Sequence, residues 1–303
     1  MSETFMVIGE ALIDIVVRAD GTTAGEYPGG SPANVALGLA RLGHGTELVT
    51  RLGRDAYGDL VAGHLAGNGV RLAPGTRDDA PTSTATARLD ADNAATYTFD
   101  LTWDLPDVRI PDATACAHAG SIATFYPPGA ARVRDLLDAA AARATVSFDP
   151  NCRPDLQGDA GAARPQVEDL VGRADVVRAS TDDLAWLYPG RDPGDVARAW
   201  LGLGPALVVV TYGAEGAHGV TPSADLRVAA SPGTVVDTVG AGDSFTSALL
   251  SGMSDAGLLG GRVPAIGPGA LTALLERAGR AAAITCSRPG ADPPTREELL
   301  TPP

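Results

Sequence analysis

A glycine-rich turn that carries one acidic residue, Gly240-Ala-Gly-Asp243, is the segment best suited to chemistry in this 303-residue chain. Small residues let a backbone approach an anion closely, and a helix predicted over residues 244–250 would add unpaired N–H groups and the positive end of its dipole. A carboxylate does not suit a turn that only binds anions, because like charges repel. Asp243 fits if it takes a proton from a nucleophile that then attacks a phosphate held by the turn. The turn alone leaves open the alternative that Asp243 is only a cap.

Two further polar residues interrupt segments that are otherwise apolar or helical. Asp14 falls within the apolar stretch 11–17, and Asn34 falls in the first turn of a helix that should begin near Pro32, with Ser31 as its cap. A charge within an apolar stretch needs a reason, which is either a turn or edge position or a contact to a ligand hydroxyl. Asn34 is either a plain polar residue or one that points into a site at the helix start.

From about residue 113 onward, the predicted strands and helices alternate. Strands are expected over residues 115–122, 145–148, 175–178 and 206–210, and helices over residues 129–143 and 269–284. This alternation predicts an α/β fold in which helices cover both sides of a mostly parallel sheet. Polar segments follow three of these strands, at residues 149–153, 180–183 and 211–216. The carboxyl ends of parallel strands are where such sheets place their ligand sites.

A hairpin is expected earlier in the chain. Two strand-like runs, residues 82–89 and 95–101, are separated by a turn signal at residues 90–93. The first run has few large apolar side chains, so the hairpin fits an exposed flap better than a core sheet. Flaps of this kind cover a site and exclude water, whereas an ordinary edge hairpin is the alternative.

The composition restricts the partners of this chain. It has 37 acidic and 23 basic residues and a formal net charge of −14, which argues against binding to nucleic acid or an anionic membrane. Every basic residue is Arg, so a lysine Schiff base and a Walker-type lysine are excluded. Cys116, Cys152 and Cys286 lack metal-ligand spacing, no targeting signal is evident, and no apolar run approaches the ~20 residues of a membrane span. We therefore expect a reduced, cytoplasmic protein.

The order of these motifs resembles the ribokinase-like (PfkB-type) carbohydrate kinase family over nearly the whole chain. The segment Asp237-Thr-Val-Gly-Ala-Gly-Asp-Ser-Phe245 is similar to the family's C-terminal signature, and Gly29-Gly30 with Asn34 is similar to its N-terminal signature. An early acid, a flap hairpin, the strand end Asp-Pro-Asn-x-Arg and the turn Thr-x-Gly-x-x-Gly follow the family's order. The resemblance implies a ribokinase-like three-layer α/β sandwich with a mostly parallel central sheet and a small β-sheet lid.

A length of 303 residues suffices for one large α/β domain with a small accessory piece. Together with the resemblance, this predicts a single ribokinase-like α/β kinase domain over residues 1–303, with lid strands from about residues 11–28 and 82–103 inserted in it. The exposed edges of such lid strands favour a homodimer that forms through the lid.

The resemblance implies ATP-dependent phosphorylation of a sugar hydroxyl. By this analogy Asp243 is the general base, and the backbone N–H groups of Gly240, Ala241 and Gly242 form an anion hole for the developing γ-phosphoryl charge. The other residues that it implies are Asp14, Gly30 and Asn34 for the sugar hydroxyls, and Thr211, Gly213 and Gly216 for the nucleotide. Arg153 is similar to a residue near the phosphates in related sugar kinases, where a guanidinium suits phosphate.

Two metal sites follow from the resemblance in the same way. Ser180 and Asp183 stand where the family has an Asn-x-x-Glu element tied to Mg²⁺ and phosphate, and this chain departs from that element at both positions. A helix cap with a first-turn acid is the structural alternative for this pair. The backbone around Asp237, Val239, Arg288 and Gly290 is similar to loops that hold a monovalent cation, so carbonyl oxygens there are candidate ligands for K⁺.

The segments near the flap are most similar to those of fructokinases. They are Gly120-Ser-Ile-Ala123, and Tyr97 and Phe99 with Trp103 in the flap. Aromatic rings suit the apolar faces of a sugar. Ribokinase and 2-keto-3-deoxygluconate kinase activities remain alternatives, as does a nucleoside kinase that stacks a base on these rings. A catalytically silent regulatory member is a further alternative, against which the intact Gly-Ala-Gly-Asp243 argues.

Overall fold

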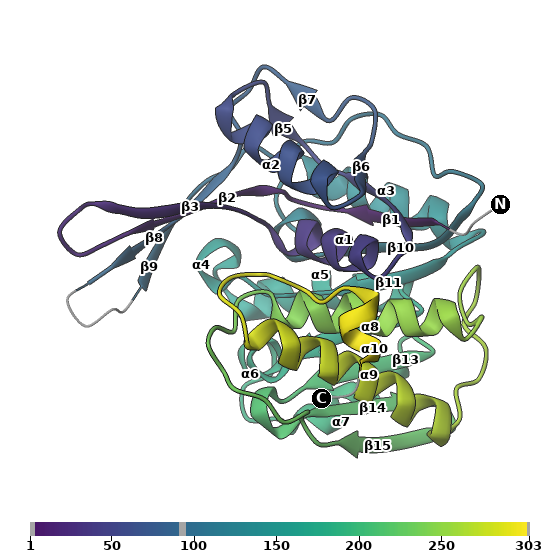
Figure 1. Cartoon of the computed structure of the whole chain (residues 1–303). Helices are drawn as coiled ribbons and strands as arrows, with labels where there is room; N and C mark the ends of the chain where they lie inside the picture. Colours follow the sequence, from purple (N-terminus) through teal and green to yellow (C-terminus); the bar gives the residue numbers. More distant parts are fainter. Residues whose placement is uncertain (1–3, 91–94, 302–303) are drawn as a thin grey trace.

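The computed structural model describes residues 4–90 and 95–301, so most of the turn predicted at residues 90–93 lies outside the described residues. Within them, nine strands form one sheet through the body of the molecule (Figure 1). In the order of the sheet, the strands are β15 (Ala224–Val228), β14 (Ala217–Thr221), β13 (Leu207–Thr211), β12 (Val176–Ser180), β11 (Thr145–Asp149), β10 (Thr114–Gly120), β1 (Thr4–Ile8), β4 (Gly45–Val49) and β6 (Val70–Leu72). All neighbours from β13 to β6 are parallel, and β14 and β15 are antiparallel. The predicted mostly parallel sheet is thus confirmed.

Alternate side chains of each central strand enter two separate cores, because successive residues of a strand point to opposite faces. On β1, Phe5 and Val7 join one core while Met6 and Ile8 join the other. The helices on the first face are α1 (Ser31–Arg41), α2 (Ala56–Gly67), α8 (Ala241–Asp255) and α9 (Pro268–Cys286). Those on the second face are α3 (Gly129–Ala141), α5 (Ala160–Arg173), α6 (Thr181–Leu187) and α7 (Pro193–Leu201). This arrangement produces the three layers of the sandwich.

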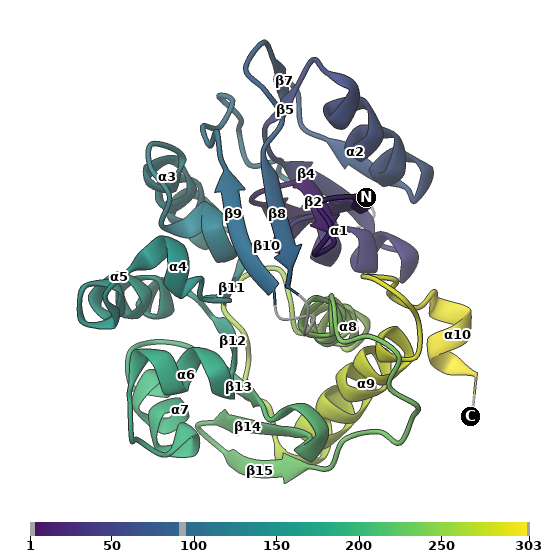
Figure 2. The ribbon, with the colours of Figure 1, turned by 90° about the vertical axis from the view of Figure 1, so that its left-hand side faces the viewer.

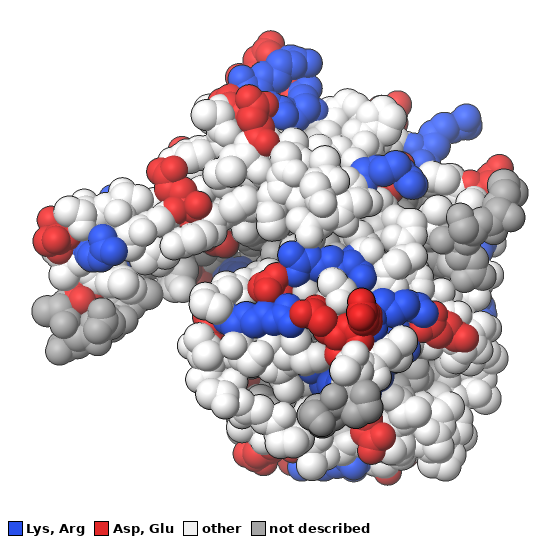
Figure 3. Space-filling model, viewed as in Figure 1, with Lys and Arg blue, Asp and Glu red and all other residues white. Residues whose placement is uncertain are grey.

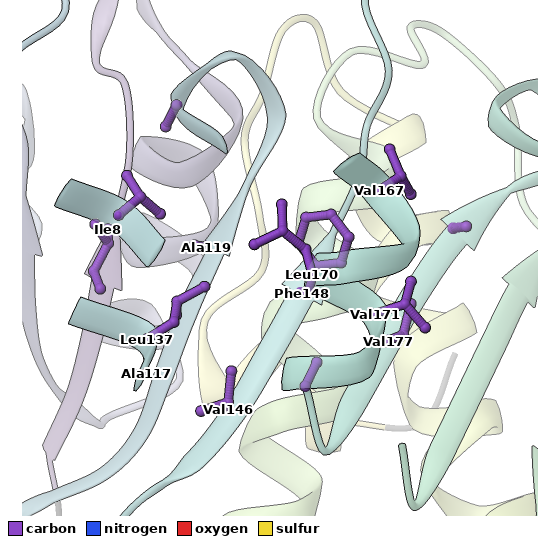
Figure 4. Packing of buried hydrophobic residues seen from close by; sticks show 14 of the residues in the cluster. Ile8, Ala117, Ala119, Leu137, Val146, Phe148, Val167, Leu170, Val171 and Val177 are labelled. Atoms are coloured by element: carbon purple, nitrogen blue, oxygen red, sulfur yellow. The ribbon is translucent and has the colours of Figure 1, made fainter. Parts of the chain in front are cut away.

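Figure 4 shows the second core, which includes Ile8 of β1, Phe148 of β11, and Leu170 and Val171 of α5; Phe148 lies beside Leu170. These four side chains are at most 2% exposed. Burial of such side chains contributes about 1.5–3 kcal/mol each. The core thus holds firmly the strands whose ends form the functional site. The sheet edge can therefore hold polar groups in fixed positions.

A second sheet projects from the body as a flat arm (Figure 1). Its strands, in order, are β3 (Thr23–Gly29), β2 (Leu12–Val17), β8 (Thr84–Leu89) and β9 (Ala95–Asp100). Strands β2 and β8 are parallel, and the two outer pairs are antiparallel. We call this sheet the lid. Strand β5 (Leu52–Gly53) pairs with β7 (Arg77–Asp78) in a separate two-stranded sheet.

The prediction that Trp103 belongs to the flap is wrong. Trp103 is 4% exposed in the second core, and its indole Nε1–H donates to the carbonyl oxygen of Ala123 at 3.1 Å. The chain turns back into the body after β9, where a large ring with one polar N–H gains more by burial than it would on an exposed arm. The aromatic residues of the lid itself are therefore Tyr27, Tyr97 and Phe99.

The glycine-rich turn is itself helical. Helix α8 begins at Ala241, three residues before its predicted start, so Gly242 and Asp243 form its first turn. In Figure 2, α8 is seen end-on, so its axis points toward the side from which the lid projects. Among the described residues, every helix is too short or too polar to span a bilayer.

Candidate functional site

A cavity of about 1000 Å³ lies between the lid and the carboxyl ends of the parallel strands. Its wall contains side chains from the lid, the start of α1, the loop after β11, the end of β12 and the start of α8. The lining residues that the sequence predicts are Asp14, Gly30, Asn34, Tyr97, Phe99, Arg153, Ser180, Asp237, Val239, Gly240, Gly242, Asp243 and Gly290. Such a cavity is at the upper end of the range for ligand pockets, and it forms where α/β sheets bind ligands.

Asp243 is held by two side chains from the beginning of α1. Ser31 Oγ donates to Asp243 Oδ1 at 2.7 Å, and Asn34 Nδ2 donates to Asp243 Oδ2 at 2.8 Å. The carboxylate is 7% exposed and forms part of the cavity wall. Each oxygen thus has one fixed donor, which determines the orientation of the carboxylate toward the cavity.

The turn before α1 explains how Ser31 and Asn34 reach Asp243. Gly30 has φ 103°, and a Cβ on it would lie 2.5 Å from the carbonyl oxygen of Glu10, so only glycine fits. Gly30 is the N-cap of α1 and no side chain caps the helix, so the expected cap role of Ser31 is wrong. Ser31 is the first helical residue instead, and its hydroxyl serves Asp243. No local pattern in the sequence indicates this contact, because it joins residues 212 positions apart.

The start of α8 forms the second side of the site. Gly240 is its N-cap in the left-handed region, with φ 73°, and no side chain caps this helix either. Of the predicted anion-hole groups, the N–H of Ala241 donates to the carbonyl oxygen of Thr238 at 3.2 Å, so it is occupied within the turn. The N-termini of α1 and α8 converge on Asp243, and both helix dipoles favour negative charge there.

Two acidic side chains at the lid side of the cavity have raised pKa values. Burial raises the pKa of Asp14 to about 6; the guanidinium of Arg153 opposes this and the charge of Asp243 adds to it. Burial raises the pKa of Glu10 to about 7, against hydrogen bonds that include one from the N–H of Ala123 to Oε2 at 3.0 Å. Glu10 follows the first strand and holds the short helix η1 (Ser121–Thr124), a role that its position in the sequence did not reveal.

Arg153 lies in the cavity wall, between strand β11 and the short helix α4 (Pro154–Gln157). Its Nη1 donates to the carbonyl oxygen of Asn151 at 2.8 Å and to the Oδ1 of the same residue at 2.5 Å. Asn151 has φ 34°, a left-handed conformation that asparagine tolerates better than most residues. The loop thus holds its own arginine, which provides a cation opposite Asp14.

A buried arginine that the sequence analysis missed lies deeper in the site. Arg178 Nη1 pairs with Asp149 Oδ2 at 3.0 Å, and Nη2 donates to Thr211 Oγ1 at 2.5 Å. Thr246 of α8 also donates to Asp149 Oδ2, at 3.3 Å. Burial raises the pKa of Asp149 to about 6, although the charge of Arg178 opposes this. A signal was available, since Arg178 is a charge inside an otherwise apolar strand.

Asp183 forms a complete capping box at the start of α6. Oδ2 accepts from the N–H and the hydroxyl of Ser180, at 2.8 and 2.6 Å, and Oδ1 accepts from the N–H of Cys152 at 2.6 Å. These contacts satisfy the carboxylate within the protein, as the structural alternative for this pair predicts. Across residues 4–90 and 95–301, no cluster of three or more His, Cys, Asp or Glu residues is arranged to hold a metal ion.

Asp237 joins the two loops that border the start of α8. Its Oδ1 accepts from the N–H of Val239 at 3.0 Å, and its Oδ2 accepts from the N–H of Gly290 at 2.7 Å. The side chain of Arg288 turns away to Glu298 Oε1, at 2.5 Å, at the short C-terminal helix α10 (Arg296–Leu300). The side chain of Arg288 therefore does not block the backbone of this loop next to the glycine turn.

The three residues predicted for the nucleotide lie at the same sheet edge, outside the lining of the cavity. Thr211 ends β13 and uses its hydroxyl to accept from Arg178. Gly213 begins the short helix η2 (Gly213–Glu215), and Gly216 follows it. Both glycines have positive φ, at 57° and 104°, so the Thr-x-Gly-x-x-Gly segment forms a tight turn.

The lid contributes aromatic rings to the cavity. The rings of Tyr97 and Phe99 stack with their centroids 6.2 Å apart. Phe99 packs against a small cluster of Leu12, Ala85 and Ile122 that joins the lid to η1, while Tyr97 is 52% exposed. The lid therefore rests on the body through apolar contacts beside the acidic groups.

Surface charge is mixed in sign on the face that Figure 3 shows, in spite of the net charge of −14. Ion pairs such as Arg41 with Asp292 and Arg296 with Asp255 connect the C-terminal segment to α1 and α8. Acidic and basic side chains are thus interspersed on this face.

Comparisons with known proteins cover almost the entire chain. A family model described as "pfkB family carbohydrate kinase" matches residues 2–298. A fructokinase of Rhizobium leguminosarum bv. trifolii is 35% identical over 265 residues, which cover 83% of this chain and 80% of the relative. A fructokinase of Klebsiella pneumoniae is 33% identical over 267 residues, which cover 85% and 87%.

Solved structures agree with this result. The fold is similar to that of a fructokinase with bound ATP from Xylella fastidiosa, with a TM-score of 0.86, 27% identity, and coverage of 99% of this chain and 98% of the other. A fructokinase double mutant from Vibrio cholerae O395, with fructose, ADP and potassium ion bound, has a TM-score of 0.76 and 25% identity, with coverage of 95% and 94%.

Proposed function

This chain belongs to the pfkB family of carbohydrate kinases, and we propose that its substrate is fructose and that Asp243 is the general base of the reaction. The observation that carries the assignment of Asp243 is its double support by Ser31 and Asn34 at the start of α8. A carboxylate oriented in this way beside a glycine turn can accept a proton from a sugar hydroxyl while the turn receives the phosphate. The fructokinases among the relatives favour fructose as the sugar.

In the proposed reaction, a hydroxyl oxygen of fructose attacks the γ-phosphorus of ATP as its proton passes to Asp243. A new P–O bond forms to the sugar, the bond from the γ-phosphorus to the bridging oxygen breaks, and ADP leaves with that oxygen. The N-terminus of α8, with Gly240 and Gly242, faces the charge that develops on the transferred group. Positioning and electrostatic stabilisation supply most of the rate enhancement in such transfers.

We assign the sugar to the lid side of the cavity. Asp14 and the amide oxygen of Asn34 would accept hydrogen bonds from sugar hydroxyls, beside the conformationally restricted Gly30. Tyr97 and Phe99 would cover an apolar face of the ring and exclude water. A site that recognises hydroxyls in this way disfavours substrates that lack them, because its own polar groups would be left unpaired.

We assign the phosphates of ATP to Arg153, Ser180 and the start of α8, and the nucleoside to the Thr211–Gly216 turn. Mg²⁺ would enter with the phosphates, since it retains waters and commonly uses substrate oxygens as ligands. The capped Asp183 is then an outer residue that fixes the Cys152 backbone, rather than a direct metal ligand. The loops that Asp237 joins would offer the carbonyl oxygens for K⁺, the ion bound in the Vibrio cholerae fructokinase structure.

The panel that tests the substrate is fructose, ribose, 2-keto-3-deoxygluconate and adenosine, each with ATP and Mg²⁺. We expect the highest kcat/KM for fructose. If kcat/KM is higher for ribose or 2-keto-3-deoxygluconate, that compound is the substrate instead of fructose. If it is highest for adenosine, the protein is a nucleoside kinase. Absence of turnover with every acceptor, in a folded protein that binds ATP, would favour a regulatory member instead.

We further propose a homodimer through the lid in the cytoplasm, where ATP is available and thiols stay reduced. Strands β3 and β9 are the open edges of the lid, and they carry Tyr27 and Tyr97, which are 56% and 52% exposed. Open edges and exposed aromatic rings suit pairing with a second copy. Light scattering should give twice the chain mass, and Thr96→Cys on β9 should form an intermolecular disulfide; a monomer at micromolar concentration would contradict this proposal.

A further inference from the structure

We propose that Arg178 is a positioning residue for phosphoryl transfer: its buried guanidinium supports the Gly242 peptide from beneath and offsets the carboxylates around it, so that this turn accepts phosphate. The inference rests on the proposed transfer at Asp243. It assigns a function to a side chain outside the motifs that identify the site.

The guanidinium lies directly against the first turn of α8. A Cβ placed on Gly242 would be 2.9 Å from both Nη1 and Nη2 of Arg178 and 3.1 Å from its Cζ. A side chain at position 242 would therefore displace the guanidinium from its present position, and glycine lets it lie directly against the turn. Both residues line the cavity, and Arg178 is 8% exposed. The positive charge thus lies against the residue whose peptide is proposed to face the phosphate.

The hydrogen bonds of Arg178 fix its position but do not use its full capacity. One nitrogen pairs with Asp149 and the other donates to Thr211, which lies on the neighbouring strand. The Nε group is buried and has no hydrogen-bond partner among the described residues. The partners therefore hold the guanidinium against Gly242.

The charges nearby make this cation necessary for phosphate binding. The carboxylates of Asp149, Asp183 and Asp243 all lie within electrostatic reach of Arg178. Without a cation among them, this part of the wall would repel the phosphates of ATP. Arg153 supplies positive charge on the lid side of the cavity, next to Asp14 and Glu10, and Arg41 in the wall is paired with Asp292, whereas Arg178 lies against the first turn of α8.

The first experiment separates charge from hydrogen bonding at this position. Arg178→Gln keeps hydrogen-bond donors but is neutral. Arg178→Lys keeps the positive charge but lacks the planar guanidinium with its several N–H donors. We expect Arg178→Gln to lower kcat about 100-fold, in the range found for loss of one oxyanion-hole donor, and Arg178→Lys to lower it about tenfold. Equal losses in the two variants, or values within twofold of the wild type, would overturn the proposal.

A binding measurement adds a readout that does not depend on turnover. Calorimetry should give Arg178→Gln a weaker affinity for ATP, by at least tenfold, and an unchanged affinity for adenosine, which lacks the phosphates. A loss of affinity for both ligands would indicate a structural role and would overturn the proposal. If Arg178→Gln does not fold, Arg178→Ala with added guanidinium decides: recovery of turnover by millimolar guanidinium, but not by urea, supports the proposal, and no recovery counts against it.

The control is Arg51, another buried arginine. It is 3% exposed and bonds to Asp78 and to the carbonyl oxygens of Ala80 and Pro81, away from the cavity. Arg51→Gln should reduce stability without changing the kcat of the folded protein. Turnover of fructose by the wild-type protein is measured first, so that failure of the proposed function is distinguished from failure of the assignment of Arg178.

Discussion

Asn34 Nδ2 lies 2.8 Å from Asp243 Oδ2, and this contact joins the first turns of α1 and α8. The two residues come from the two motifs that the sequence analysis singled out at opposite ends of the chain. Because Asn34 can donate to Asp243 and still present its amide oxygen, one side chain can orient both the proposed base and the proposed substrate. The site is therefore a coupled unit rather than two separate binding halves.

Replacement of Asp243 by Asn should lower kcat by about 10²–10⁴-fold, because a neutral amide cannot accept the proton of the sugar hydroxyl. Affinity for ATP should stay within about threefold, since loss of a negative charge near the phosphates does not weaken their binding. Stopped-flow turnover and calorimetry measure the two quantities. Asp255→Asn, at the other end of α8, is the matched control. An Asp243→Asn variant with near-native kcat would remove the general-base assignment.

The two donors of Asp243 should differ in their effects. Ser31→Ala removes only an orienting hydrogen bond, so kcat should fall about tenfold with little change in the KM for fructose, as expected for loss of about 1–1.5 kcal/mol. Asn34→Ala also removes a proposed sugar contact, so the KM for fructose should rise as well. Ser247→Ala, a buried hydroxyl that bonds within α8, is the control. Identical changes in both variants would mean that Asn34 does not touch the sugar.

The sequence predicted the sheet well because its central strands are long apolar runs, such as Val208–Val210, that suit burial on both faces. It did not predict α5 or α7. A proline, Pro165, lies inside α5, and α7 begins in a segment rich in Gly, Asp and Pro, so local propensity opposes both helices. Tertiary packing of their apolar faces outweighs that propensity.

The same dependence on tertiary packing decides which features of the site could be predicted from the sequence. Asp243 and Asn34 could be found because each interrupts a recognisable local pattern. Arg178 also interrupts an apolar strand, but its contacts and those of Ser31 could not be predicted, because they join residues 33 and 212 positions apart and depend on the close approach of two elements. Trp103 was misplaced for the same reason, since its core partners belong to distant segments.

Asp183 should matter more for stability than for the metal. Replacement by Ala removes hydrogen bonds to Ser180 and to the N–H of Cys152, so the free energy of unfolding should fall by about 1–3 kcal/mol. Asp183→Asn should leave the Mg²⁺ concentration for half-maximal activity within about threefold. Urea unfolding and Mg²⁺ titration measure these effects, with the adjacent exposed Asp182→Asn as control. A tenfold higher Mg²⁺ requirement in Asp183→Asn alone would restore the metal role.

Glu10 should make stability depend on pH. Its pKa rises from 4.5 to about 7 on folding because of burial, so the folded protein binds more protons than the unfolded chain between these values. The free energy of unfolding should therefore fall as pH rises from about 4.5 to 7, by at most roughly 3 kcal/mol from this group, and then level off. Glu10→Gln should reduce that fall, because the neutral side chain still accepts from Ala123. The control is Glu276→Gln at an exposed position on α9, which should leave the pH dependence unchanged. If the free energy of unfolding of Glu10→Gln runs parallel to that of the wild type over this pH range, Glu10 is not a buried titrating group.

Phe99 should control how well the closed lid excludes water. Its ring packs on Leu12, Ala85 and Ile122 at the joint between the lid and η1, so Phe99→Ala loosens that joint and removes a cover from the sugar. We expect the KM for fructose to rise about tenfold, equivalent to 1.4 kcal/mol. A loosened lid should also admit water as a competing acceptor, so the ratio of ATP hydrolysis to sugar phosphorylation should increase. Phe99→Leu keeps an apolar side chain at the joint, so its KM and its hydrolysis ratio should lie between those of the wild type and Phe99→Ala. If coupled assays of ADP and sugar phosphate give the same ratio for Phe99→Ala as for the wild type, the lid does not exclude water through this ring.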